Sequence, residues 1–433
     1  MSVRTGARIK AGIEVLGAVI NRHRPASLAL ADWGRANRYA GSGDRSAIGN
    51  LVYDVLRHRS SLAVRMGSDA PRALVLAAAP AALGLSVDEV VAAADGSKYS
   101  IPPLSDEETA GLLREVPADA PAWVRADIPD WLWPSFERVF AGDAERQGVA
   151  LAERAPVDLR VNTLRTSREQ VLEALAKFGP VPAALAPNGV RLPPPQSGAR
   201  QANVEAEGAH GRGWFEVQDE GSQVAAAMTG ARAGMKLLDY CAGAGGKTLA
   251  LAAMMGNKGC IMAYDRDRVQ LRPIFDRLPR SGATNVEVAD AGDTAALAAL
   301  EAACDVVLVD APCTGSGTWR RRPDSKWRLQ QKNIPQRQEE QRAVLDAACR
   351  YVKSGGRLVY VTCSVLAEEN TDTVAWFVAA HPEFALIPFA DVWRDTIATP
   401  PPKSADGRED TLLLTPASHG TDGFFVAVMG RLG

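Results

Sequence analysis

Two cysteines that each follow a strand-like run offer the clearest chemistry in this sequence. Cys313 comes after the apolar run 306–309, and Cys363 comes after the run 358–361. In an open α/β sheet, the loops that follow the carboxyl ends of parallel strands form the ligand crevice. We therefore predict that both thiols lie at one ligand-facing edge of a sheet, where a thiolate could act as a covalent nucleophile.

A glycine-rich turn lies upstream of the cysteines, between the strand-like run 236–240 and an expected helix. It reads Ala-Gly-Ala-Gly-Gly-Lys-Thr from Ala242 to Thr248. Small residues let the backbone approach a cofactor closely, and the free N–H groups at the start of the helix can bind it. A nucleoside triphosphate is disfavoured, because the first glycine of a P-loop, counted back from Lys247, would fall at Cys241.

Acidic residues follow three successive strand-like runs, at Asp265, Asp290 and Asp310. Asp265 stands nineteen residues beyond Gly246, which is the spacing at which a carboxylate reaches ribose hydroxyls. Each aspartate alone could simply cap a helix, but three at equivalent positions favour acids that line one cleft. They suit a ligand with a ribose and a positive centre, such as S-adenosylmethionine, better than a pyrophosphate.

The thiols and acids together fit the methylation of a pyrimidine ring at C5. That carbon is a poor nucleophile until a thiolate adds to C6, so the reaction needs a thiolate, a neighbouring carboxyl group and a methyl donor. Asp310, Cys313 and Cys363 could supply the first two, and which cysteine attacks stays open. Lys247 could lower a thiol pKa or hold a phosphate or base edge. The other cysteines are expected to be structural: Cys241, Cys260, Cys304 and Cys349.

Length and composition bound the class of protein. A chain of 433 residues is expected to form two or three domains, and 46% hydrophobic with 23% charged residues is ordinary for a globular protein. No apolar run approaches the roughly 20 residues that span a bilayer, and charges break any signal-like run at the N-terminus. We expect a cytoplasmic enzyme that acts as a monomer. With no CxxC pair and five histidines, neither a metal site nor a disulfide framework is expected.

Basic residues concentrate in two segments, although the formal net charge is −2. Residues 1–66 carry eleven Lys and Arg against four acids, and residues 319–337 carry seven against one. Local basic patches attract a phosphate backbone, so RNA is the expected partner, although either patch alone could be a solvated face. The candidate RNA contacts are Arg160, Asn162, Arg320, Arg321, Arg322 and Lys326.

Hydrophobic periodicity divides the chain into three parts. Residues 1–140 show helical spacing, residues 141–222 mix short strands with a helix, and residues 223–433 alternate strands with helices. The predicted fold class is α/β, with a doubly wound, Rossmann-like domain preceded by a small α+β subdomain and an all-helical N-terminal domain. Strands of the third part are expected at 236–240, 260–265, 285–289, 305–309, 357–362 and 424–429. Its helices are expected near 246–255, 267–279, 294–303, 331–352 and 366–380, and residues 391–420 are expected to form a lid or an insertion.

Five segments resemble the signatures of a known family, in the same order along the chain. They read LRVNTLRTS (159–167), FEVQDEGSQ (215–223), DAPCTGSGTWRRRPDSKW (310–327), LVYVTCSVLAEEN (358–370) and DGFF (422–425). By these segments, residues 150–433 resemble the RsmB/Sun-type RNA (cytosine-5) methyltransferases. Residues 1–140, with DRSAIGNLVYDVLRHR at 44–59, are similar to the NusB-like helical RNA-binding domain that bacterial members carry.

The resemblance implies roles for the site residues. Cys363 would be the nucleophile that adds to C6, Cys313 would assist release of the methylated product, and Asp310 would contact N3 at the edge of the cofactor. The family usually has a proline where this chain has Ala244, so the turn is expected to be more flexible here. The residues implied to bind S-adenosylmethionine are Cys241, Ala242, Gly243, Ala244, Gly245, Gly246, Lys247, Asp265, Asp290 and Asp310.

The sequence therefore predicts an S-adenosylmethionine-dependent RNA cytosine-5 methyltransferase, with 16S small-subunit ribosomal RNA as the expected substrate. Transfer RNA is the alternative substrate. A non-catalytic RNA-binding assembly factor is the alternative of a different class, and an intact set of thiols, acid and lysine disfavours it. A small-molecule methyltransferase would leave the basic segments and the extra domains without a use.

Overall fold

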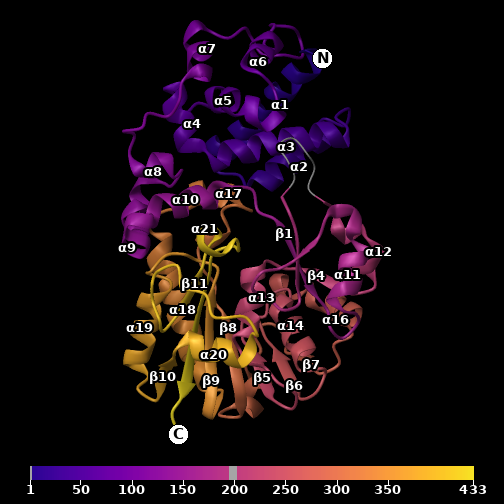
Figure 1. Ribbon diagram of the computed structural model, residues 1–433, viewed down its shortest axis with the longest axis vertical. Coiled ribbons are helices and arrows are strands. Elements are labelled where there is room, and N and C mark those ends of the chain that lie inside the picture. Colours follow the sequence, from indigo (N-terminus) through magenta and orange to yellow (C-terminus); the bar gives the residue numbers. More distant parts are fainter. Residues whose placement is uncertain (1, 195–201) are drawn as a thin grey trace.

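The structure is a computed structural model, and it describes residues 2–194 and 202–433. A helical part forms one end of an elongated molecule, and a large sheet with its helices forms the other end (Figure 1). A small antiparallel sheet lies beside the large one (Figure 1). Among the described residues, no helix combines the length and the apolar character that crossing a membrane requires.

The N-terminal part is all-helical, as its periodicity predicts. Leu16, Leu51, Val52 and Leu76 are fully buried in the core that these helices share. The apolar residues of the expected helix around Ile48 face this core, which confirms the helical spacing of that segment. The helices are α1 (Ser2–Asn21), α2 (Ala26–Ala36), α3 (Ser42–Arg57), α4 (Arg59–Met66), α5 (Pro71–Leu83), α6 (Val87–Ala93) and α7 (Asp106–Leu113).

A second group of helices connects this part to the sheets. It consists of α8 (Ala122–Arg125), α9 (Trp133–Phe140) and α10 (Ala144–Ala152). Phe136, Phe140 and Leu151 are buried in the same hydrophobic cluster as one face of the large sheet. The two hydrophobic clusters therefore divide between Leu112 and Ala126, since apolar residues of α9 and α10 pack with those of the sheet. The domain boundary expected at residue 140 stays a prediction.

The small sheet has four antiparallel strands in the order β2-β3-β1-β4. Its strands are β1 (Val157–Val161), β2 (Val181–Pro182), β3 (Gly189–Leu192) and β4 (Phe215–Val217), with α11 (Arg168–Ala174) packed on it. Ser167 caps α11, since its hydroxyl accepts a hydrogen bond from the Gln170 N–H while the Gln170 side chain accepts from the Ser167 N–H. The α+β character expected for this segment is confirmed.

The large sheet is doubly wound, with the strand order β10-β12-β9-β8-β5-β6-β7. The strands from β9 to β7 are parallel, whereas β12 runs antiparallel to both β9 and β10. Alternate residues of β8 belong to different hydrophobic clusters, Val307 and Val309 to one and Val306 and Leu308 to the other, so both faces of the sheet are covered. The strands are β5 (Lys236–Asp239), β6 (Cys260–Ala263), β7 (Val286–Val288), β8 (Cys304–Asp310), β9 (Val352–Thr362), β10 (Phe384–Ile387), β11 (Leu412–Leu414) and β12 (Phe424–Arg431).

The helices around the large sheet agree with the expected ones except at two places. The segment expected as one helix at 267–279 divides into α15 (Arg268–Leu271) and α16 (Ile274–Ser281) at Pro273, and 294–303 forms only a 3-10 turn, Ala295–Leu300. The remaining helices are α13 (Glu220–Ala227), α14 (Gly246–Met254), α17 (Pro323–Arg328), α18 (Asn333–Cys349) and α19 (Thr371–Ala380).

The segment 391–420 is not the lid or insertion expected from its polar composition. It begins within α20 (Phe389–Thr396) and contains β11 and α21 (Pro416–His419). All three leucines of β11 are buried, and β11 pairs with β12. A three-residue strand is too short to show an alternating pattern, so hydrophobic periodicity could not predict it.

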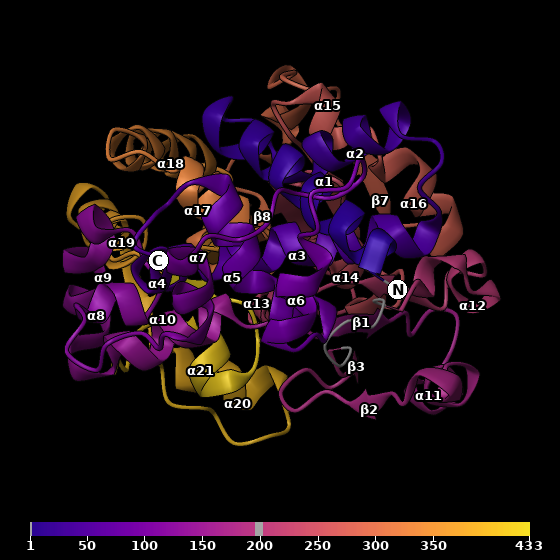
Figure 2. The ribbon, with the colours of Figure 1, turned by 90° about the horizontal axis from the view of Figure 1, so that it is seen from above.

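The helical part is joined to the large domain by hydrogen bonds at the end of α3. The last carbonyl groups of a helix have no partner within the helix. Here the Lys326 ammonium donates to the Arg57 carbonyl at 3.2 Å, and the Trp327 indole N–H donates to the Leu56 carbonyl at 2.6 Å. Both donors come from α17, which lies against α3 in the two views of Figures 1 and 2. The positive charge of Lys326 also suits the negative end of the helix dipole.

Replacing Trp327 by alanine is expected to loosen this joint. The substitution removes a large side chain that packs on the helical core, together with a hydrogen bond, so we expect a loss of about 3 kcal/mol in the free energy of unfolding. Urea unfolding measures it. Arg328→Ala, on the same helix but more exposed, is the control and should change stability by less than about 0.5 kcal/mol. Equal losses in the two variants would contradict the joint.

Candidate active site

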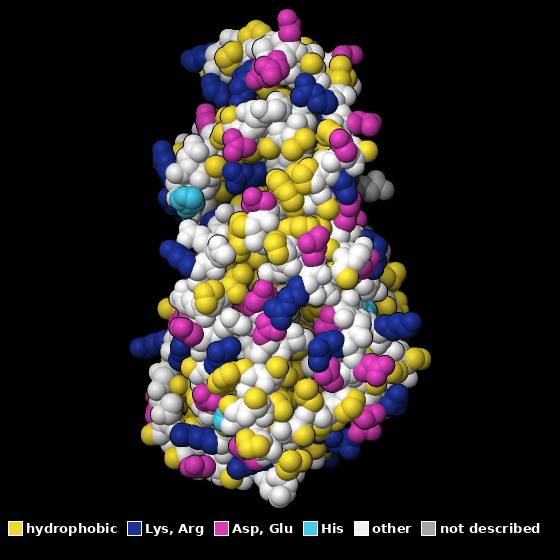
Figure 3. All heavy atoms as spheres, turned by 90° about the vertical axis from the view of Figure 1, so that its left-hand side faces the viewer, with side chains coloured by type: hydrophobic (Ala, Val, Ile, Leu, Met, Phe, Trp, Pro, Cys, Tyr) yellow, Lys and Arg dark blue, Asp and Glu magenta, His cyan; other side chains and the backbone are white. Residues whose placement is uncertain are grey.

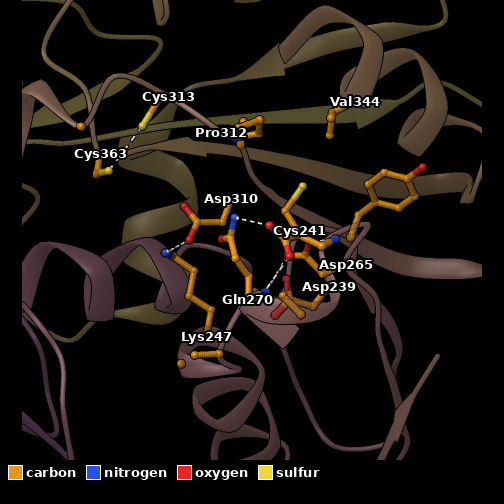
Figure 4. Close-up of a pocket in the computed structure, with 18 of the residues that line it drawn as sticks. Asp239, Cys241, Lys247, Asp265, Gln270, Asp310, Pro312, Cys313, Val344 and Cys363 are labelled. Atoms are coloured by element: carbon orange, nitrogen blue, oxygen red, sulfur yellow. Dashed lines mark hydrogen bonds and ion pairs between the residues drawn. The ribbon is translucent and has the colours of Figure 1, made fainter. Parts of the chain in front are cut away.

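The two cysteines meet because of how β8 pairs with β9. In this parallel pair Asp310 lies opposite Val361, so the chain reaches Cys313 and Cys363 at the same edge of the sheet. Their sulfur atoms are 3.3 Å apart (Figure 4). The Gly317 N–H also donates to the Cys363 carbonyl at 3.0 Å, which joins the two loops through their backbones. The predicted proximity of the thiols is confirmed.

The Cys313 thiol holds its proton firmly. Its hydrogen bond with Cys363 and its burial raise its pKa well above the usual value, and the nearby carboxylate of Glu369 adds to this. Burial also raises the pKa of the Cys241 thiol, next to the glycine turn. Cys241 therefore stays a neutral thiol, which agrees with the structural role expected for it.

The glycine turn positions backbone groups between β5 and α14. Gly243 and Gly245 have left-handed φ angles of 49° and 81°. A Cβ atom on Gly245 would lie 2.5 Å from the Ile274 side chain, so this position has no room for a larger residue. Asp265 supports the turn, because its carboxylate accepts a hydrogen bond from the Gly243 N–H at 2.9 Å.

Lys247 and Asp310 form an ion pair at the edge next to the thiols. The Lys247 ammonium lies 2.5 Å from an Asp310 carboxylate oxygen, and it also faces the ring of Phe424 at 5.3 Å. Lys247 is buried, whereas the Asp310 side chain is 34% exposed. Figure 4 shows the pair pointing toward the same space as Cys363. Lys247 thus forms an ion pair with Asp310 and not with either thiol.

These groups line one cavity of about 940 Å³. Its wall includes residues on both sides of the turn, the two thiols, and acids from the ends of β5 and β8. Among the described residues, no group of three His, Cys, Asp or Glu side chains is placed to hold a metal ion. The residues expected at the site that line the cavity are Cys241, Ala242, Gly243, Ala244, Gly246, Lys247, Asp265, Asp310, Cys313 and Cys363.

Two residues predicted to bind the cofactor do not line this cavity. Asp290 follows β7 as expected, but its side chain is exposed at the end of the edge strand. Gly245 packs against Ile274 and shapes the turn from behind. Of the three acids expected at strand ends, Asp265 and Asp310 line this cavity, and cofactor binding by Asp290 stays a prediction.

Asp239, at the end of β5, is a site residue that the sequence reasoning missed. It lines the cavity, and its carboxylate accepts a hydrogen bond from the Thr248 hydroxyl at 2.6 Å. The other oxygen is buried and has no hydrogen-bond partner among the described residues. Burial raises the pKa of Asp239 to about 7. Its position as the last residue of the strand before the glycine turn was the available signal.

Arg320 and Arg321 of the basic segment 319–337 form ion pairs with Asp219 and Asp422, in which an Arg321 nitrogen is 2.8 Å from an Asp219 oxygen and another is 2.5 Å from an Asp422 oxygen. Arg320 is buried and is paired with the same two acids, whereas the Arg321 side chain is 30% exposed. Buried charges require partners, so these arginines hold three loops together. Other basic residues of the segment are exposed: Arg322, Arg328 and Lys332.

Three more of the candidate RNA contacts are buried. Arg160 donates to the Gln218 side chain at 2.7 Å, and Asn162 donates to the Gly213 and Ser281 carbonyls at 2.8 Å. Lys326 is used in the joint with α3. Of the six candidates, Arg322 alone is exposed, and it lines the cavity.

The surface on the side of α8 and α9 is neither uniformly basic nor uniformly acidic. Figure 3 shows basic and acidic side chains interspersed on this face, with hydrophobic groups between them. Neighbouring charges of opposite sign largely cancel each other's field, so this face presents no extended basic patch.

The fold and the site together define a Rossmann-like methyltransferase. A parallel sheet carries an antiparallel strand, β12, near one edge, and the first βα turn and the next strand end form a cofactor-type cavity. The chain belongs to the RsmB/F family: the model of the 16S rRNA methyltransferases RsmB/F matches residues 228–430. The RsmF/B-like ferredoxin-like domain matches residues 128–197.

Relatives and solved structures agree with this membership. The ribosomal RNA small subunit methyltransferase B of Sodalis glossinidius is 34% identical over 329 residues, which cover 74% of this chain and 71% of the relative. A probable methyltransferase of the same name from Synechocystis is 32% identical, covering 69% of this chain and 66% of the relative. The crystal structure of PH0851 has a TM-score of 0.73 at 26% identity and covers 100% of this chain and 99% of its own.

Replacing Asp239 by asparagine is expected to stabilise the ligand-free protein in a pH-dependent way. Below about pH 4 the carboxyl group is protonated in both folded and unfolded chains. As the pH rises toward 7, the unfolded chain loses this proton while the folded protein keeps it, so the wild type loses stability relative to the variant. Above about pH 7 the difference should level off at about 4 kcal/mol.

Urea unfolding of the two proteins between pH 5 and pH 8 measures this difference. Asparagine can still accept the hydrogen bond from Thr248, so the comparison isolates the charge. Asp290→Asn, at an exposed carboxylate, is the control and should show no such trend. A difference for Asp239→Asn that does not change with pH would contradict the buried, protonated state of this acid.

Proposed function

We propose that this protein is an S-adenosylmethionine-dependent RNA cytosine-5 methyltransferase that acts on 16S ribosomal RNA. The observation that carries the proposal is the pair of thiols 3.3 Å apart in one cavity with the glycine turn and the Lys247–Asp310 ion pair. The names of the relatives support ribosomal RNA as the substrate. The chemistry of cytosine supports the need for a thiolate.

The residues present fit S-adenosylmethionine as the cofactor. The turn at 242–246 offers backbone N–H groups, and the unpartnered buried oxygen of Asp239 suits a cationic amine. Asp265 stands at the end of the second strand, where a carboxylate can bind ribose hydroxyls. When bound, the cofactor supplies an electrophilic methyl group. The protein's own residues activate and hold the base.

The proposed reaction uses Cys363 as the nucleophile. Its thiolate forms a bond to C6 of cytosine, while Asp310 contacts N3 and stabilises the charge that develops on the ring. The electron pair of the C5–C6 double bond then makes C5 nucleophilic. After C5 is methylated, its proton is removed, the C5–C6 double bond is restored, and the C6–sulfur bond breaks with its electron pair returning to Cys363.

The contact between the thiols supports a division of roles. The hydrogen bond to Cys363 is the largest cause of the raised pKa of Cys313. Once the Cys363 sulfur is bonded to C6, it is neutral and no longer competes with Cys313 for a proton. Cys313 can then ionise and take up the C5 proton, which is the step that releases the product. The proposal therefore has the two thiols ionise in turn.

Substitution of each cysteine tests this division. Cys363→Ala should form no covalent protein–RNA adduct and lose activity by at least about 1000-fold, because the nucleophile is missing. Cys313→Ala should still form the adduct but release it slowly, so that the adduct accumulates. Denaturing gels with radiolabelled 16S RNA and cofactor measure both outcomes. Adduct accumulation in Cys363→Ala instead would reverse the roles.

The RNA backbone is expected to contact the protein next to the cavity. Arg322 is exposed, lines the cavity, and has no carboxylate partner among the described residues. A guanidinium in this position can neutralise a phosphate close to the target base. The helical part and the small α+β sheet would add contacts to the shape of the RNA, with the target base unpaired or flipped.

Arg322→Ala is expected to weaken RNA binding with little effect on the cofactor. Loss of one phosphate contact should raise the Kd for 16S RNA fragments about tenfold and reduce the slope of log Kd against log salt by about 1. Filter binding at several salt concentrations measures this. Lys258→Ala, an exposed residue before β6 at the opposite end of the strands, is the control. An unchanged salt slope would exclude a phosphate contact at Arg322.

Bisulfite mapping identifies the substrate. In 16S ribosomal RNA from a strain that lacks this protein, a methylated cytosine should be lost and then restored by the wild-type gene but not by Cys363→Ala. Loss of a site in transfer RNA instead would establish the alternative substrate. Loss of no site, together with no binding of S-adenosylmethionine in calorimetry, would favour a non-catalytic assembly factor.

A further inference from the structure

Glu369 is a buried carboxylate beside the thiols that the proposed reaction does not use. It lies between Cys363 and α19, its side chain is fully buried, and burial raises its pKa. No lysine or arginine pairs with it among the described residues. A buried carboxyl group in this setting must be satisfied by hydrogen bonds.

The hydrogen bonds of Glu369 reach the loops of both cysteines. Its carboxylate accepts from the Thr314 N–H at 2.8 Å and from the Thr314 hydroxyl at 2.5 Å, next to Cys313. It also accepts from the Ser364 hydroxyl at 2.5 Å, next to Cys363. The Gln341 amide of α18 donates to it at 3.1 Å.

Further contacts make these loops one connected unit. The Ser364 hydroxyl lies 2.9 Å from the Ser316 hydroxyl, which also accepts a hydrogen bond from the Val365 N–H at 2.9 Å. The Gln341 amide donates to the Pro312 carbonyl at 2.9 Å as well. Among the residues that the structure describes, the carboxylate of Glu369 is the group bonded directly to a neighbour of each cysteine, so it lies at the centre of this network.

We propose that Glu369 is a positioning residue that joins the loops of Cys313 and Cys363 and sets the contact between their sulfur atoms. Its role in catalysis rests on the proposed function, but its effect on the thiols does not. In this contact Cys313 is hydrogen-bonded to the Cys363 sulfur, which raises the pKa of Cys313 and keeps its thiol protonated. The negative charge of Glu369 acts in the same direction, because it disfavours a second anion at Cys313.

Glu369→Gln tests the proposal with a change of almost no volume. The Thr314 and Ser364 hydroxyls donate to one carboxylate oxygen, and the Thr314 N–H and the Gln341 amide donate to the other. The amide keeps one oxygen and presents an NH2 group in place of the other, so one of these two pairs of hydrogen bonds loses its acceptor and the link between the loops is weakened. Without the contact and the charge, Cys313 should ionise more readily. Its alkylation by iodoacetamide at pH 7.5, followed by mass spectrometry of the peptides, should then be about tenfold faster than in the wild type.

Glu368→Gln is the matched control. Glu368 is the adjacent residue, but its carboxylate accepts from Ser135 and not from either cysteine loop. Its alkylation rates should equal those of the wild type. Ser364→Ala removes one donor only and should give an intermediate rate, so the inference stays testable if Glu369→Gln folds poorly. Equal Cys313 alkylation in all four proteins would overturn the proposal.

A kinetic measurement separates positioning from general stability. With 16S RNA, Glu369→Gln should lower kcat about 100-fold and leave the KM for RNA within about threefold, because the thiols are misaligned while the RNA surface is intact. A parallel rise in KM at constant kcat would contradict this. If the alkylation rates change as expected but the wild type methylates no RNA, then the proposed function fails and the positioning role stands.

Discussion

The parallel pairing of β8 with β9 is the constraint on which the site depends. Because Asp310 lies opposite Val361, the loops that follow the two strands leave the sheet at the same height and bring their thiols together. A shift of one residue in either strand would turn every side chain to the opposite face of the sheet. Each face of β8 packs in a different hydrophobic cluster, so such a shift would disrupt the close packing of both, and the hydrophobic core sets the geometry of the reactive groups.

Two arginines of the basic segment 319–337 form ion pairs inside the molecule. Arg320 and Arg321 follow the Cys313 loop and meet Asp219 and Asp422, which come from the start of α13 and the loop before β12. Such a buried cluster costs desolvation but fixes the relative positions of its elements, since any unpaired member would be strongly unfavourable. The loops around the cavity are therefore held in place by the ion pairs of Arg320 and Arg321 and by the hydrogen bonds of Glu369.

Much of the fold and part of the site could be predicted from sequence. The strands that carry the site have strong apolar runs, and residues that follow such strands are brought together by topology, as Cys313 and Cys363 are. Prediction failed where the outcome depends on partners far along the chain. Arg320 was expected on the surface, because its acidic partner Asp422 lies about 100 residues away in the sequence. Asp290 follows an edge strand, and such a position does not by itself turn a side chain toward the cavity, so its contact with a cofactor stays a prediction.

The capping of α3 by Lys326 and Trp327 gives the molecule a fixed span. A helix whose last carbonyls are completed by another part of the chain does not swing independently of it. The distance between the helical part and the cavity is therefore fixed by the fold. A long, folded ligand that contacts both the helical part and the cavity can place a base in the cavity only if its own shape matches this distance. The protein can therefore select ligands by their three-dimensional shape before it contacts any base.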